Sequence, residues 1–516
     1  MKKLLLAICV AASLLTACER HGTTLCVNPL TYTDIPDNDV IRVGDTYYMV
    51  STTMYFCPGA PIMKSKDLVH WQIVSYIYDC LADDDIYNLR DGGRHAYGKG
   101  QWATTLRYVD GVYYALFIAN DQRKTFVYRT TDIESSNWEC NIIPQAMHDA
   151  SLLFDDDGRV YSVWGNGSLR ITELEPDLSA IKEGGVDQLL IESPREGINL
   201  RAEGSHVYHI GDYYYVLEID WPRNGVRTET CWRSKELLGE YESKVVLQGK
   251  FDGRNDGVAQ GAIVETQYGD WYAIMFQDHG AVGRIPTLQP VTWVDGWPVM
   301  GDNGTPVKEF EVQLTECGEN RVWASDEFDY QADSDLDLVW QWNHKPLDGC
   351  WSVTERPGWL RLTTGQLADR IADARNTLTQ RTVGPACYSE TKLDASGLKP
   401  GNHAGLCAFQ SNFCALDVTV SDEGEKTLSA IDRNGEILST VMPGNEVWLR
   451  LNYDFNTDRA TMAYSFDCNE WLTMDYQLQM RYTLDYFTGY RSALYNYATK
   501  ELGGVADFDY FHQDTI

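Results

Sequence analysis

Apolar and polar residues alternate along the first part of the chain around one short pattern that recurs five times. In each copy a turn that contains glycine is followed by aromatic residues. The copies span residues 43–48, 109–114, 156–161, 210–215 and 268–272. Gly-Asp and Asp-Gly pairs supply the positive φ that a two-residue hairpin turn needs, and the flanking residues alternate as paired strands do. Each copy therefore predicts a β-hairpin.

The copies recur at intervals of roughly 45 to 65 residues, which suits a four-stranded propeller blade with insertions. Further hairpins are expected in several units, for example over residues 62–71 and 231–239. We therefore predict an all-β chain with a five-bladed propeller over residues 28–320. A stacked β-sandwich is the alternative arrangement of the same hairpins.

The repeat stops near residue 320, but the segments that follow are again typical of strands. They cover residues 338–342, 359–362 and 447–451, and turns such as Arg433-Asn434-Gly435 separate them. Strands at this spacing predict a sandwich. We expect a second all-β domain, a β-sandwich, over residues 324–516.

Composition and charge exclude several classes of protein. Of 516 residues, 44% are hydrophobic and 23% are charged, which fits neither a disordered chain nor a protein with many membrane spans. The 75 acidic residues outnumber the 43 basic ones, so the net charge of −32 repels phosphate backbones and no nucleic-acid partner is expected. The 31 Tyr and 16 Trp fit strands, and exposed aromatic rings would suit sugar faces.

The N-terminus predicts export. Lys2 and Lys3 precede an apolar run over residues 4–15, which is typical of a secretory signal over residues 1–17 and too short for a membrane span. Leu15-Thr16-Ala17-Cys18 resembles a bacterial lipobox, which implies a lipidated Cys18, a tether over residues 18–27 and a lipid anchor in the membrane. A plain signal with an incidental cysteine is the alternative. No acidic cluster follows Cys18, so the periplasmic side of a Gram-negative cell is favoured over the cell surface.

The 13 cysteines contain no C-x-x-C pair, and no zinc or redox motif is expected. In an exported chain of this size they predict buried thiols with one or two bridges. The sequence assigns no pairing.

Three carboxylic acids precede apolar strands at the start of repeats: Asp37, Asp149 and Glu203. If each begins an innermost strand of a propeller, their side chains converge near one end of the central channel. Hydrolysis of a glycosidic bond needs one protonated acid for the leaving oxygen and one carboxylate for water or direct attack. The convergent acids therefore indicate a hydrolytic site, with acidic caps of turns as the alternative.

At these residues and at several other motifs the chain resembles glycoside hydrolase family 43. The motifs occur in the family's order, over residues 28–37, 40–48, 58–61, 65–71, 102–103, 148–152, 202–208 and 276–284. The resemblance implies a five-bladed propeller, and the form with a concanavalin-like β-sandwich after it is similar to the second half of this chain, including residues 378–382.

The resemblance also implies roles for single residues. Asp37 corresponds to the general base that activates water, Glu203 to the general acid, and Asp149 to the residue that orients the acid and tunes its pKa. The implied mechanism is inverting. Trp102 is expected at the sugar face and Arg284 near the substrate hydroxyls, with a buried blade tryptophan and a structural salt bridge as the respective alternatives.

One departure from the family concerns a metal. Many members have a histidine near an axial metal or water in the stretch that here reads Ala259-Gln260. An axial calcium is therefore not favoured, and Gln260 is expected to line the substrate site and to hydrogen-bond only solvent there. A structural calcium at Glu327 and Asp509 is a second hypothesis, because hard oxygen ligands lie on two terminal strands. No cofactor is required for the reaction.

The sequence therefore predicts an exo-acting glycosidase that releases terminal α-L-arabinofuranose or β-D-xylose from hemicellulose side chains or oligosaccharides, with arabinofuranose favoured and release of both sugars included. The expected partner is an arabinose- or xylose-decorated oligosaccharide. One alternative is β-D-xylosidase as the main activity. Another is a glycan-binding lipoprotein without catalysis, although all three acids are present, and a third is a propeller scaffold for protein partners.

Overall fold

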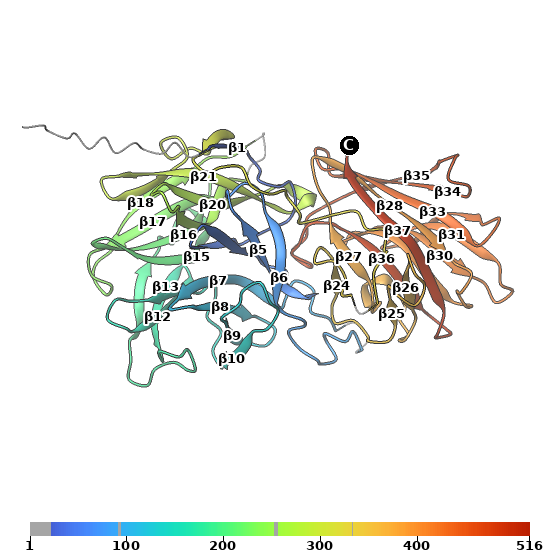
Figure 1. Cartoon of the computed structure of the whole chain (residues 1–516), viewed down its shortest axis with the longest axis horizontal. Coiled ribbons are helices and arrows are strands. Elements are labelled where there is room, and N and C mark those ends of the chain that lie inside the picture. The colour runs from blue at the N-terminus through green and yellow to red at the C-terminus, as the bar shows by residue number, and fades with distance from the viewer. Residues whose placement is uncertain (1–21, 91–93, 252–255, 333) are drawn as a thin grey trace, which may run out of the picture.

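The computed structural model describes residues 22–90, 94–251, 256–332 and 334–516, which form two lobes side by side (Figure 1). The predicted signal over residues 1–17 and the predicted lipidation site at Cys18 lie outside the described residues. Apart from two short 3₁₀ helices, η1 (Gly280–Val282) and η2 (Ile371–Asp373), the regular elements described are strands. None of the described helices is long and apolar enough to cross a membrane.

The first lobe contains five sheets of four antiparallel strands each. The first two blades are β2 (Asp39–Val43), β3 (Thr46–Val50), β5 (Gly59–Ser65) and β6 (Gln72–Tyr78), then β7 (Gln101–Val109), β8 (Val112–Ala119), β9 (Lys124–Thr130) and β10 (Glu139–Ile143). The third is β11 (Ser151–Phe154), β12 (Val160–Asn166), β13 (Ser168–Leu174) and β14 (Asp187–Glu192). The last two are β15 (Ile198–Ile210), β16 (Tyr213–Pro222), β17 (Thr228–Ser234) and β18 (Glu242–Gln248), then β19 (Val258–Glu265), β20 (Trp271–Asp278), β21 (Arg284–Val294) and β22 (Trp297–Met300).

The five repeated turns each join the first and second strands of a blade, as the sequence predicts. The first strands β2, β7, β11, β15 and β19 contact one another in a closed ring, so they are the inner strands of a propeller. The predicted five-bladed propeller is confirmed.

The start of the propeller lobe differs from the sequence expectation. Residues 24–27, which we assigned to a tether, form β1 (Thr24–Val27) and pair with β23 (Glu309–Val312). Cys26 in β1 is buried, and the side chain of Thr24 donates to the carbonyl oxygen of Leu314. The pairing joins the two ends of the propeller segment, because β23 follows its last blade.

One guanidinium group links four of the five blades at the axis. Arg107 on β7 donates through Nη1 to the buried carboxylate of Asp39 on β2, at 2.8 Å. It also donates to Ser151 Oγ and the Leu152 carbonyl on β11, at 2.8 and 2.9 Å, and to the Val207 carbonyl on β15 at 3.3 Å. A buried charge is stable only when its donors and acceptors have partners, and these inner strands supply them.

The second lobe is a sandwich of two antiparallel sheets. The first has eight strands in the order β32 (Gly435–Val441), β31 (Lys426–Asp432), β30 (Cys414–Val420), β29 (Asn402–Phe409), β36 (Arg491–Ala498), β27 (Leu378–Arg381), β24 (Gln341–Asn343) and β4 (Phe56–Cys57). The second has seven, in the order β25 (Trp351–Ser352), β26 (Leu360–Thr363), β37 (Val505–Thr515), β28 (Ala386–Asp394), β33 (Glu446–Asp454), β34 (Arg459–Ser465) and β35 (Leu472–Gln479).

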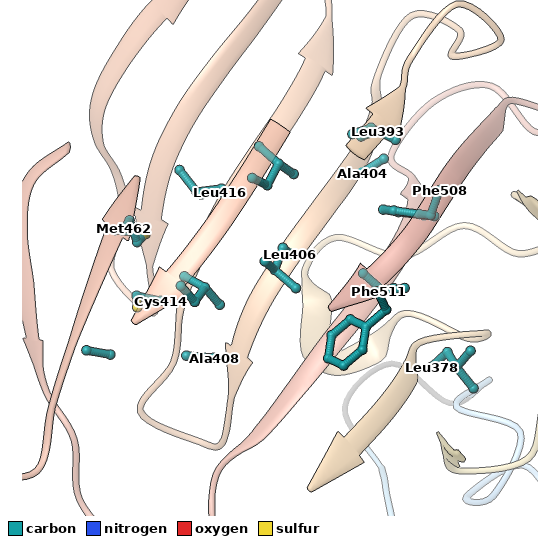
Figure 2. Packing of buried hydrophobic residues seen from close by; sticks show 14 of the residues in the cluster. Leu378, Leu393, Ala404, Leu406, Ala408, Cys414, Leu416, Met462, Phe508 and Phe511 are labelled. Carbon is teal, nitrogen blue, oxygen red and sulfur yellow. The ribbon is translucent and has the colours of Figure 1, made fainter. Parts of the chain in front are cut away.

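Alternate residues of both sheets fill the core between them (Figure 2). Leu406 and Leu416 of the eight-stranded sheet and Phe508 and Phe511 of the seven-stranded sheet are fully buried. Because side chains alternate across a strand, the residues between these core positions point to the opposite face of the sheet. The predicted second all-β domain with a concanavalin-like sandwich is confirmed.

The two lobes share a sheet, and a disulfide lies beside the shared strand. Strand β4 belongs to the propeller part of the sequence, yet it pairs with β24 at the edge of the eight-stranded sheet. Cys57 at the end of β4 forms a disulfide with Cys80 after β6, a pairing that the sequence did not assign. The division at residue 320 therefore separates the chain less cleanly than the repeat pattern suggests.

Replacing Arg107 by Leu should destabilise the protein by about 3–5 kcal/mol, because Asp39 would remain as a buried, unpaired charge. Urea unfolding of the wild type and the variant measures this difference. The control is Arg129→Leu, since Arg129 and Glu139 form a pair whose side chains are 51% and 75% exposed, and such pairs contribute less than about 1 kcal/mol. Equal losses in the two variants would contradict the axial role of Arg107.

Candidate active site

All six residues that the sequence assigned to catalysis or substrate binding line one cavity of about 470 Å³. They are Asp37, Trp102, Asp149, Glu203, Gln260 and Arg284. They come from the inner strands of the five blades or the residues just before them, except Arg284, which begins β21. The convergence that the sequence predicted is therefore present in the structure.

Backbone irregularities at the start of the inner strands aim these side chains into the cavity. Asp37, Asp149 and Gln260 have φ angles of 53°, 46° and 59°, in the left-handed region that non-glycine residues rarely adopt. Gly204, next to Glu203, has a φ of 64°, and a Cβ there would lie 2.7 Å from Cγ of Gln260. Residues held in such conformations cluster at functional sites.

Glu203 lies inside β15, not before a strand as the sequence analysis expected. The pairing of β15 with β16 shifts register on both sides of Glu203. Such bulges redirect a side chain from one face of a sheet. This irregularity places the carboxyl group of Glu203 beside the loop that carries Asp149.

Asp37 is held by two donors. Its Oδ1 accepts hydrogen bonds from Arg284 Nη1 at 2.9 Å and from Gln260 Nε2 at 3.1 Å. Gln260 thus contacts a predicted catalytic residue, which corrects the expectation that it hydrogen-bonds only solvent. Arg284 is 5% exposed, and its Nε and Nη2 are buried without a hydrogen-bond partner among the described residues. Buried donors of this kind normally have a partner, so these atoms are available to a ligand.

Glu203 belongs to a second hydrogen-bonded group with His148, Asp149 and Asn166. Oε2 of Glu203 lies 3.2 Å from Nε2 of His148 and also accepts a hydrogen bond from the side-chain amide of Asn166. Nε2 of His148 is 3.6 Å from Asp149 Oδ2, which accepts the backbone N–H of Gly204 at 3.0 Å. The histidine therefore lies between the two carboxyl groups.

Burial and charge shift two pKa values in this group. Burial, together with the charges of Glu203 and Asp37, raises the pKa of Asp149 well above its ordinary value, against the opposing effect of His148. Burial alone would lower the pKa of His148, but the carboxylates of Asp149 and Glu203 outweigh it and raise that pKa to about 9. The imidazole is therefore protonated at neutral pH.

His148 and Asn166, the two partners of the Glu203 carboxyl group, are residues that the sequence analysis did not assign. His148 directly precedes Asp149 in the motif over residues 148–152, so the sequence placed it next to a predicted catalytic acid. Asn166 ends β12 at the turn to β13, and it belongs to none of the motifs used in the sequence analysis. Only the pairing of β12 with β13 and the closeness of β12 to β15 bring it to Glu203.

The sandwich lobe forms one wall of the cavity. Tyr482, Leu484 and Phe487 line it. The ring of Phe487 packs edge-on against Trp102, with ring centres 5.7 Å apart, and lies 4.7 Å from the guanidinium carbon of Arg284. The sandwich therefore contributes side chains to the site directly.

Asp34 fastens this wall to the propeller. Its Oδ1 accepts the backbone N–H of Arg284 at 2.7 Å, and its Oδ2 accepts the hydroxyl of Thr488 and the N–H of Gly489 at 3.0 and 2.9 Å. The segment that carries Phe487 and the arginine that binds Asp37 are thus held by one carboxylate.

Among the described residues, His148, Asp149 and Glu203 are the group of potential metal ligands whose donor atoms lie within 4.8 Å of one another. The hydrogen bond between His148 and Glu203 and the ion-pair contact between His148 and Asp149 account for this closeness. Glu327 contacts His512 at 2.6 Å and Asp509 lies 3.7 Å from Lys392. Because each lies against a basic group, these contacts give no support to the predicted calcium site, which stays a prediction.

The fold and the acid-lined cavity define a class, a glycosidase built on a five-bladed propeller with a trailing sandwich. Residues 26–298 match the glycosyl hydrolases family 43, and residues 325–513 match the beta xylosidase C-terminal concanavalin A-like domain. The chain belongs to glycosyl hydrolases family 43.

Two relatives of known name and one solved structure illustrate what this chain is similar to. A beta-xylosidase of Formosa agariphila is 30% identical over 96% of this chain and 91% of its own length. A non-reducing end alpha-L-arabinofuranosidase of Bacteroides ovatus is 27% identical over 80% and 77%. A solved structure described as a bifunctional GH43-CE of Bacteroides eggerthii is 43% identical, with a TM-score of 0.90 over 96% of this chain. The present chain spans 64% of that protein's length.

Replacing Glu203 by Gln should lower the pKa of His148 from about 9 toward its ordinary value, because one of the two neighbouring carboxylates is removed. NMR titration of the histidine ring measures this pKa, with Glu139→Gln at the surface as the matched control. Since folding raises this pKa, the stability that the imidazolium supplies is complete below about pH 6.5 and is lost as the pH rises through about 9. An unchanged titration in Glu203→Gln would contradict the arrangement.

Proposed function

We propose that the protein is an exo-acting, inverting glycosidase that releases terminal α-L-arabinofuranose, with β-D-xylose as the other candidate sugar. The observation that carries the proposal is the meeting of Asp37, Asp149 and Glu203 in one cavity of about 470 Å³. The relatives named as beta-xylosidase and as alpha-L-arabinofuranosidase support these two sugars. The natural substrate is then an arabinose- or xylose-decorated hemicellulose or oligosaccharide.

In this mechanism Glu203 protonates the leaving oxygen as general acid. His148 and Asn166 both contact Oε2 of Glu203 and fix the direction in which its carboxyl group points. Because burial and neighbouring charge raise the pKa of Asp149, the cluster of acids retains a proton close to neutral pH. Asp149 thereby tunes and orients the acid, and the proton stays near the bond that breaks.

Asp37 acts as the general base that removes a proton from the attacking water. Arg284 and Gln260 hold one of its carboxylate oxygens in place. The remaining donors of Arg284 are placed to bind substrate hydroxyls, while Trp102 and Phe487 offer apolar rings to a sugar face.

The proposal predicts that Glu203→Gln and Asp37→Asn each reduce kcat by about 10²–10⁴-fold, because each removes a proton-transfer group without changing its shape. Release of 4-nitrophenol from the α-L-arabinofuranoside and the β-D-xyloside measures the rates, and their ratio identifies the preferred sugar. Asp157→Asn, in an exposed turn, is the control. Proton NMR of the first product formed reports whether the anomeric configuration is inverted.

An inactive wild type that still binds oligosaccharide in calorimetry would overturn the proposal in favour of a capture protein. Full activity in either acid variant would refute the role given to that residue.

We also propose that the chain is exported as a lipoprotein facing the periplasm, on the support of residues 1–18 alone. Cys18→Ser should move the full-length protein from the membrane fraction to the aqueous fraction when it is made in a Gram-negative host. Cys9→Ser, within the predicted signal, is the matched control and should stay with the membrane. Membrane association of both variants would contradict lipidation at Cys18.

A further inference from the structure

A second, larger cavity of about 1030 Å³ lies on the outer face of the eight-stranded sheet. We call it the sandwich cleft and define it by His403, Asp417, Thr419, Phe413, Arg370 and Leu484, which line it. His403 lies on β29 and Asp417 and Thr419 on β30, at alternate positions whose neighbours Leu416 and Val418 face the core. The cleft is therefore formed by the face of the sheet that points away from the sandwich core.

Part of this outer face is covered by segments outside the sheet. Tyr55 and Tyr97 from the propeller part, with Tyr486, pack against Cys407 and Ala415 on the sheet in one buried cluster. Tyr97 and Tyr486 of this cluster also line the cleft, together with polar residues such as Asp417 and Arg370. The cleft therefore lies at the border of this cover.

The floor of the cleft is an ordered polar network. Asp417 is only 2% exposed, accepts a hydrogen bond from the hydroxyl of Tyr495 at 2.8 Å and contacts Nδ1 of His403 at 2.8 Å. The ring of His403 stacks on Tyr497, with centres 4.6 Å apart and an angle of 3° between the planes. A fixed array of polar groups beside aromatic rings is typical of sites that bind small polar ligands.

The sandwich cleft adjoins the candidate active site. Gly98 and Leu484 line both cavities. Leu484 is 76% exposed, the highest value among the large apolar side chains of the described residues. A Cβ on Gly98 would lie 2.7 Å from the carbonyl oxygen of Asp485, so the backbone at Gly98 packs closely against the segment that carries Leu484 and Asp485. We call this contact, which lies between the two cavities, the saddle.

We propose that the sandwich cleft binds the leaving part of the substrate, an extended neutral glycan chain that crosses the saddle at Gly98 and Leu484. This inference rests on the proposed function, because the active-site cavity would hold the terminal sugar. The half-buried ring of Phe413 and the exposed Leu484 offer apolar contacts to sugar faces. Arg370 and Glu436, among others, line the cleft with both signs of charge, which favours a neutral chain over a charged one.

The test compares a short and a long substrate with the full chain. The short one is the 4-nitrophenyl glycoside, and the long one is a xylo-oligosaccharide of six residues that bears the same terminal sugar. Thr419→Trp fills the cleft, and Thr473→Trp makes the same change on β35, on an exposed position of the other sheet. Thr419→Trp should lower kcat/KM for the long substrate at least fivefold through a higher KM, while Thr473→Trp should not.

The rate on the 4-nitrophenyl glycoside should stay within twofold in both variants, which also shows that they fold. His403→Ala, which removes one of the two partners of Asp417, should act in the same direction as Thr419→Trp. Equal chain-length dependence in the wild type and Thr419→Trp would overturn the inference and leave the proposed function standing. A wild type that hydrolyses neither glycoside would overturn the proposed function, and the inference would fall with it.

Discussion

The arrangement of the propeller depends on the hydrogen bonds that the guanidinium group of Arg107 donates. It joins β2, β7, β11 and β15 at the axis through Asp39, Ser151, Leu152 and Val207. Asp39 and Ser151 are the first residues of β2 and β11, and each follows a predicted catalytic acid, Asp37 or Asp149, by two residues. The network that fixes the start of these two strands thus also restrains the residues just before them, where the two acids lie. Burying this charge is favourable only while all of these strands are in place.

Two features complete the site: irregular backbone at the inner strands of the propeller, and a cover that the sandwich supplies. Left-handed residues and register shifts turn Asp37, Asp149 and Glu203 toward one point, at some cost in backbone strain. The sandwich then covers that point with Phe487, which Asp34 holds through the neighbouring Thr488 and Gly489. The trailing lobe is therefore part of the site, and strand β4 joins the two lobes through its pairing with β24.

Electrostatics in the cavity are balanced locally, although the whole chain is strongly acidic. Arg284 neutralises Asp37 on one side, and the protonated His148 lies between Asp149 and Glu203 on the other. Three carboxyl groups can share a buried cavity only if some are paired with cations or hold a proton. This division separates a group suited to act as a base from a group that retains a proton, as an acid–base pair requires.

The sequence by itself determined the five hairpins, the second all-β lobe and the positions of Asp37, Asp149 and Glu203, because turn chemistry and strand alternation are local properties of the chain. Their roles in catalysis remain proposals. Only the tertiary structure decided that His148 and Asn166 contact Glu203, that Gln260 binds Asp37, that Phe487 reaches Trp102 and that Cys57 pairs with Cys80. These contacts join residues from different blades or different lobes, and they depend on how strands twist and pack around the axis. No local sequence pattern specifies that packing. The partners of each acid therefore follow only from the closed propeller and from the sandwich that packs against it.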